Sequence, residues 1–202
     1  MNLRTSLLAA AALFGMSTAA FAVPVSGQLS LGGFAAAVGS VGMGAATGID
    51  FVSSGSGSRS PGVAGGITSF GAGSGSFVGF SCASTAGSCG SIQDVANFST
   101  QGALSSFLTL TSGSTTVSFD LTKISNVSND LTNNQLGFTA VGFINETGFD
   151  RTAGTFNLTA QGDNIVSFSA TTLAAASVPE PASLALLGGT LALVGLVRRK
   201  KA

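Results

Sequence analysis

Hydrophobic and polar residues alternate with a period of two in the second half of the chain. The clearest segments are 115–121, 155–161 and 165–171, where Val, Phe, Leu and Ala alternate with Ser, Thr, Asn and Asp. This pattern is typical of antiparallel strands that bury one face. The last two segments are separated by Gly162-Asp163-Asn164, which suits a hairpin turn. The more uniformly apolar segment 137–144 predicts a strand at the centre of a sheet.

The first half of the chain is dominated by glycine and serine. Residues 27–90 hold 18 of the 29 glycines, so we expect loops between short strands there. The strands that we predict are 28–33, 48–52 and 76–80, and 34–41 is the one segment of the body with helical periodicity. The glycine clusters do not fit the spacing of phosphate-binding loops. Together, the two halves predict an all-β, antiparallel, β-sandwich-like single domain over 23–177.

The amino-acid composition argues against several classes of function. The 202 residues include no His, Trp or Tyr, and 8% are charged. Without His there is no Ser/His/Asp or Cys/His catalytic unit and no imidazole metal ligand. The body 23–177 carries three cations and seven anions, 3 − 7 = −4, which disfavours nucleic acid as a partner. We therefore expect no enzyme activity, cofactor or metal site.

The N-terminal segment 1–22 reads as a secretory signal peptide. Arg4 provides the positive charge, 7–14 the apolar core, and Ala20-Phe21-Ala22 a small-x-small site for signal peptidase, with Val23 as the new N-terminus. The expected partners are the Sec translocon and signal peptidase. The competing interpretation, a buried N-terminal helix, does not account for this order of charge, apolar run and cleavage site.

A second apolar run, 182–197, precedes a basic tail at 198–202. Its 16 residues span roughly 24 Å as a helix, slightly less than the hydrocarbon layer, which bilayer thinning and snorkelling can accommodate. The tail contains four consecutive cations: Arg198, Arg199, Lys200 and Lys201. They should stay cytoplasmic and stop transfer, leaving the body outside the inner membrane. An amphipathic core helix is the alternative, but the run lacks a polar face.

Directly before this run stands Val178-Pro179-Glu180-Pro181, within the motif 178–183. The two prolines fix the backbone, and Glu180 is held extended because a proline follows it. An extended segment beside a membrane suits a protease, and Pro181 suits the first turn of a helix. A glycolipid-anchor signal is the nearest rival, but its apolar tail does not normally end in four cations.

In these three parts, residues 178–202 resemble the PEP-CTERM sorting domain of exported Gram-negative bacterial proteins. The resemblance implies that an exosortase, a membrane-embedded cysteine enzyme, recognises the motif and cuts near it. It also implies an inner-membrane precursor with its body in the periplasm, and later release or transfer to the cell surface. The body resembles, more loosely, a small cargo module of such proteins in 46–51 and 147–156, which implies no site residues.

The two cysteines, Cys82 and Cys89, are separated by six residues. Export to an oxidising compartment favours a disulfide between them. Two free thiols remain an alternative, and a zinc site would require ligands that the chain does not offer nearby.

The acidic residues are scattered and do not form an EF-hand pattern. Asn129-Asp130 and Asp163-Asn164 are candidates for a loop Ca²⁺ site, but both pairs also suit turns. Glu146 and Asp150 are the nearest approach to a paired-carboxylate glycosidase. Four Asn-x-Ser/Thr sequons, at Asn97, Asn126, Asn145 and Asn157, are explained by composition.

These observations favour an exported, non-enzymatic protein of the cell surface or of an exopolysaccharide matrix. The alternative is a carbohydrate-binding module that retains matrix polysaccharide. The absence of Trp and Tyr weighs against the alternative, because sugar binding commonly uses aromatic platforms.

Overall fold

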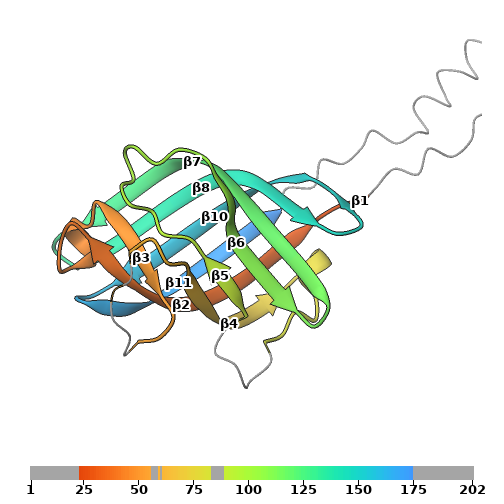
Figure 1. Ribbon diagram of the computed structural model, residues 1–202, viewed down its shortest axis with the longest axis horizontal. Helices are drawn as coiled ribbons and strands as arrows, with labels where there is room; N and C mark the ends of the chain where they lie inside the picture. Colours follow the sequence, from red (N-terminus) through yellow and green to blue (C-terminus); the bar gives the residue numbers. More distant parts are fainter. Residues whose placement is uncertain (1–22, 56–58, 60, 83–88, 175–202) are drawn as a thin grey trace, which may run out of the picture.

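The computed structural model describes residues 23–55, 59, 61–82 and 89–174, and these residues form an all-β fold (Figure 1). The long strands alternate between buried and exposed residues, as expected for a sheet with one apolar face. The strands and short 3₁₀ helices are β1 (Val23–Pro24), β2 (Gly27–Val38), η1 (Met43–Ala45), β3 (Gly48–Val52), β4 (Gly65–Gly73), η2 (Gly75–Phe77), β5 (Gly90–Ile92), β6 (Leu104–Ser112), β7 (Thr115–Asp130), β8 (Gln135–Glu146), β9 (Phe149–Asp150), β10 (Thr152–Gln161) and β11 (Ile165–Ala174).

The main sheet closes on itself as an antiparallel barrel of eight strands. Its order is β2-β4-β5-β6-β7-β8-β10-β11, and β11 pairs again with β2 over Ile165–Ala174. The antiparallel all-β prediction is confirmed, but the sandwich-like arrangement is wrong. Each strand of this ring pairs with a neighbour on both sides over at least part of its length. The ring therefore has no edge strand.

Strand β3 is an addition to the ring at one end of the barrel. It pairs with the second half of β2, from Phe34 to Val38, whereas β4 pairs with the first half. All five residues of β3 are buried. The strand therefore covers the core beside the second half of β2, where β4 no longer pairs with β2.

Apolar side chains fill the barrel interior, as is usual for eight strands. Phe107 of β6 lies at the centre, with ring centroids 5.4 Å from Phe156, 6.3 Å from Phe51 and 6.4 Å from Phe119. The buried phenylalanines are Phe51, Phe77, Phe107, Phe119, Phe138, Phe156 and Phe168. With no Trp or Tyr in the chain, these rings supply the aromatic core.

Strand predictions differ in outcome between the two halves of the chain. The strands at 115–121, 137–144, 155–161 and 165–171 are confirmed, as is the antiparallel hairpin that joins the last two. The predictions at 28–33 and 48–52 are also confirmed. Residues 76–80 are not a strand, because η2 and a turn occupy them, and 34–38 continue β2 instead of forming a helix.

The barrel has two distinguishable ends. At the end that we call terminal lie β1, the start of β2, η2 and the end of β11, on the right of Figure 1. The opposite end, which we call distal, contains the turns 39–47, 131–134 and 162–164. At the distal end Gly42 bridges to Asp163, and the Gly162 N–H donates to the Asn134 carbonyl at 3.0 Å.

Candidate functional site

Most residues predicted to direct export lie outside the described residues. These are Ala20 and Ala22 of the cleavage site, the motif Val178–Pro181, the apolar run 182–197 and the tail Arg198–Lys201. Val23, the predicted new N-terminus, is the first residue of β1 and pairs in parallel with Phe149. The Val25 N–H then donates to Thr152 Oγ1 at 2.9 Å.

No helix among the described residues has the length and apolar character needed to cross a membrane.

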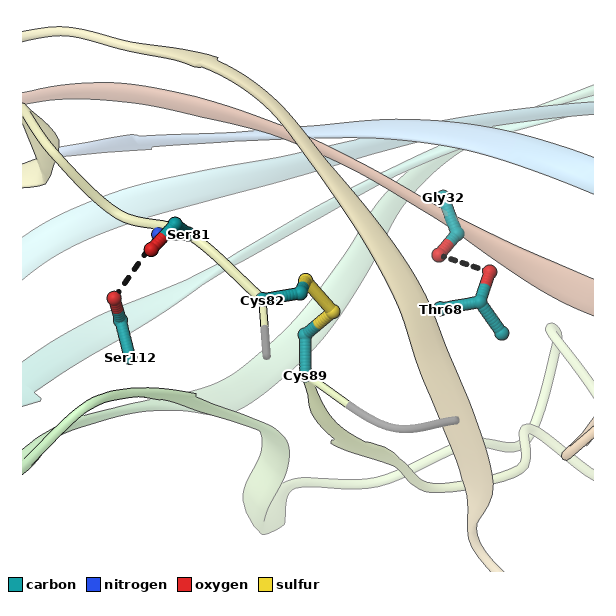
Figure 2. The surroundings of a disulfide bond; sticks show 6 residues. All are labelled: Gly32, Thr68, Ser81, Cys82, Cys89 and Ser112. Atoms are coloured by element: carbon teal, nitrogen blue, oxygen red, sulfur yellow. Dashed lines mark hydrogen bonds between the residues drawn. A yellow bond between two sulfur atoms is a disulfide. The ribbon is translucent and has the colours of Figure 1, made fainter. Parts of the chain in front are cut away.

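The predicted disulfide between Cys82 and Cys89 is confirmed, with Cα atoms 5.1 Å apart (Figure 2). Both cysteines are anchored to the barrel wall. The Cys89 N–H donates to the Ile67 carbonyl of β4, and its carbonyl accepts from Thr111 of β6 at 2.8 Å. Beside Cys82, the Ser81 N–H donates to Ser112 Oγ at 3.0 Å. The bond therefore ties the segment after η2 to β5 and its neighbours, which is a structural role.

The acidic residues considered for Ca²⁺ hold turns: Asp130 bonds within its own turn, and Asp163 bonds to a neighbouring one. Asp130 accepts hydrogen bonds from the Thr132 and Asn133 N–H groups, and these lower the pKa of its carboxyl, with Asn133 the larger cause. Asp163 Oδ1 accepts from Asn134 Nδ2 at 2.8 Å. Within the described ranges, no group of three His, Cys, Asp or Glu residues comes close enough together to hold a metal ion.

Asp120 is the centre of a polar cluster on the outside of β7. Its carboxylate accepts from the Ser106 N–H at 2.8 Å and from Asn145 Nδ2 at 2.9 Å, and it lies 3.6 Å from Arg151. The Ser106 N–H is the main cause of a lowered pKa for Asp120. Arg151 also covers the ring of Phe143, with Cζ 3.8 Å from the ring centroid. These bonds join β7 to Ser106 of β6 and to Asn145 of β8. We therefore interpret the cluster as a structural link between neighbouring strands.

Glu146 ends β8 at the terminal end, and burial raises the pKa of its carboxyl. Its Oε2 is buried and has no hydrogen-bond partner among the described residues. Asp150, the other member of the proposed carboxylate pair, lies exposed in β9.

We expect Glu146→Gln to stabilise the protein at neutral pH by less than about 1 kcal/mol, because it removes a partly buried charge that solvent still screens. A carboxyl with a raised pKa binds its proton more readily in the folded than in the unfolded state. The free energy of unfolding of the wild type therefore rises as pH falls through that pKa, and the advantage of the variant disappears. Urea titrations between pH 7 and pH 4 measure the difference, and a gain that does not change with pH would contradict this explanation.

A groove at the distal end is the first candidate binding site. It has a volume of about 390 Å³, within the usual range for ligand sites. We call it the distal groove; it is lined by Ala46, Thr47, Asn97, Phe98, Ser99, Ile124, Ser125, Asn126, Val127 and Asn129. The half-buried ring of Phe98 packs on Phe138 at 5.5 Å between centroids. Amide and hydroxyl groups surround this ring, and no charged residue lines the groove.

Local backbone irregularity creates the distal groove. The register between β7 and β8 shifts twice, between Leu121 and Lys123 and between Ile124 and Asn126. Such bulges bend a strand and redirect its side chains. Opposite β7, the Phe98 N–H donates to the Thr47 carbonyl at 2.8 Å, and Asn97 Oδ1 accepts from the Ser99 N–H at 2.8 Å. Two sequons, at Asn97 and Asn126, thus meet in one groove, although nothing in their sequence predicts it.

A second polar pocket, of about 500 Å³, surrounds Asp94. Asp94 accepts from the Phe51 N–H at 2.8 Å and from the Gly62 N–H at 2.7 Å. Partial burial raises the pKa of Asp94 despite these two bonds, which act in the opposite direction. On the facing strand, Ser106 adopts a positive φ of 50° beside a register shift. The two hydrogen bonds show Asp94 joining β3 to the loop before β4, which is sufficient to explain its position.

Comparison with known protein families identifies one segment of the chain, at its C-terminal end. Residues 177–201 match the PEP-CTERM protein-sorting motif. The resemblance inferred from residues 178–202 is thereby confirmed, and it supports an exported surface protein that an exosortase processes from a membrane-anchored precursor. Searches of curated proteins and of solved structures find no significant match.

Proposed function

We propose that this protein is a non-enzymatic structural component of the cell surface or extracellular matrix, with the barrel as the delivered cargo. The match at 177–201 is the observation that carries the proposal. The Sec translocon exports the chain, and signal peptidase removes 1–22. The run 182–197 holds the precursor in the inner membrane with the barrel in the periplasm. Exosortase then cuts near 178–181 and releases the barrel toward the surface.

The barrel is suited to a structural role outside the cell. Its ring closes all eight strands, so strand edges that could pair with other chains are limited to its ends. The disulfide adds about 2–3 kcal/mol of stability in the chain-entropy model and survives in oxidising compartments. Strands β2, β4, β10 and β11 contain no charged residue. Their outer surface offers hydroxyl, amide and apolar groups, which suits contact with neutral polymers.

The proposal predicts that Glu180→Gln impairs processing in the native host. The substitution removes the single charge between the two prolines that the enzyme is expected to recognise, so precursor should accumulate in the inner membrane several-fold. The matched control is Asp150→Asn, which removes one exposed carboxylate from the terminal end of the barrel. Immunoblots of fractionated cells measure both. Unchanged mature mass and location in the Glu180 variant would contradict the proposal.

A second candidate function is binding of a neutral polysaccharide, and the distal groove favours it. A half-buried Phe98 ring with surrounding amide and hydroxyl groups matches what sugars require: one apolar face with hydrogen bonds at the edge. We expect Asn126→Ala to weaken binding of the host's polysaccharide about tenfold, because it removes one or two hydrogen bonds. The control, Thr116→Ala, alters an exposed residue of the same strand outside the groove. Co-sedimentation measures both, and equal binding would exclude the groove.

A further inference from the structure

The two segments expected to enter the membrane are connected to the same end of the barrel. The described fold begins at Val23, in β1, and ends at Ala174, in β11. Ala174 pairs with Gly27, only four residues after Val23. Figure 1 shows β1 at the terminal end, and η2 adjoins the residues before β2, where the Ser76 N–H donates to the Ser26 carbonyl at 2.7 Å. Among the described residues, the opposite, distal end carries the turns 39–47, which include η1, 131–134 and 162–164.

The linker to the membrane is short compared with the barrel. Seven residues, 175–181, separate Ala174 from the apolar run, and fully extended they reach about 25 Å. Strand β7 has 16 residues and runs roughly 50 Å along its path, or about 40 Å along the barrel axis at the usual strand tilt. A body held by one end on a linker shorter than itself keeps that end nearest the anchor.

We propose that, in the membrane-anchored precursor, the terminal end of the barrel faces the lipid bilayer and the distal end faces away from it. The inference rests on the proposed function in one respect, that 182–197 is the anchor. In this orientation the distal groove lies on the side of the barrel that is open to partners outside the membrane. It also brings the terminal end against exosortase, because three residues separate Ala174 from Val178.

Surface chemistry does not by itself choose this orientation. Val78 and Leu173 are exposed at the terminal end, by 71% and 36%, but Leu131 at the distal end is exposed by 76%. The charged residues near the terminal end, Asp120, Glu146, Asp150 and Arg151, sum to −2, so anionic lipid does not attract this end. The linker is therefore the cause, and lengthening it should remove the preference.

Two matched cysteine variants test the orientation. Ser114→Cys and Thr132→Cys each alter an exposed turn residue, one just before β7 and one just after it. The native cysteines are in a disulfide, so a maleimide fluorophore reports the introduced position, and the wild-type chain gives the background. The precursor without its signal peptide, residues 23–202, is reconstituted into phosphatidylethanolamine/phosphatidylglycerol vesicles that carry an energy acceptor on the lipid headgroup. Vesicle flotation first establishes anchoring.

We expect energy transfer from position 114 to exceed that from position 132 about twofold or more, given their separation of roughly 40 Å along the axis. A flexible insert of 20 Gly and Ser residues after Ala174 should bring the two efficiencies close together, which would support the role of the linker. Equal or reversed efficiencies in floating vesicles would overturn the orientation alone. Failure of the chain to float would overturn the anchor, and with it both this inference and the proposed function.

Discussion

Phe107→Ala is expected to lower the free energy of unfolding by about 3–5 kcal/mol. Phe107 is fully buried and meets three other rings inside the barrel, from Phe51, Phe119 and Phe156. Its removal leaves a cavity that rigid strands on all sides cannot close, because each is held by two neighbours. Equilibrium denaturation in urea, with the disulfide intact, measures the loss.

The control for Phe107 is Phe143→Ala on the outer face of β8, where the ring is half-exposed beside Arg151. This variant should lose about 1 kcal/mol, from the cation–π contact and limited burial. A similar loss for both variants would contradict the description of the barrel interior as a closed aromatic core.

Gly142→Ala is expected to destabilise the barrel by at least 1–3 kcal/mol, the usual cost of overpacking, and to disturb the pairing of β7 with β8. A Cβ at this position would collide with the Asp120 carbonyl oxygen and lie 2.9 Å from the Phe119 ring. A backbone atom in a sheet cannot move aside as a side chain can, so the two strands must separate. Thermal unfolding and amide exchange of β7 measure the effect.

The same strand provides the control for Gly142. At Gly137 the nearest atom to an added Cβ is 3.7 Å away, an ordinary van der Waals distance. Gly137→Ala should therefore be neutral or slightly stabilising, because it reduces the entropy of the unfolded chain. If the two substitutions had equal effects, the close approach of β7 and β8 at Gly142 would be refuted.

The sequence predicts most clearly those strands in which apolar and polar side chains alternate. In β10, Phe156 and Leu158 alternate with polar residues and give both the strand and its buried face. The alternation does not predict β6, because Phe107 and Leu108 are both buried where the register shifts, which breaks the period of two. Nor does it predict β4, whose glycines lack the side chains that would form the pattern. Closure into a barrel depends on the pairing of β11 with β2, more than 125 residues apart, which no local pattern encodes.

The candidate sites divide in the same way. The sorting motif and the disulfide follow from residues close together in sequence, and both could be predicted. The distal groove combines Thr47, Phe98 and Asn126, which only the barrel brings together. The sequence also gave no sign that Glu146 is partly buried, because it occupies the last position of a strand.

The central claim is that this chain is cut at both ends and delivered as a barrel. The direct measurement is the intact mass of the protein recovered from the cell surface or the medium, with sequencing of both termini. We expect an N-terminus at Val23, a mass 2 Da below that of the dithiol, and loss of the tail Arg198–Lys201, with a longer precursor in the membrane fraction. Recovery of free protein that still carries the basic tail, with no membrane-bound precursor, would contradict the account.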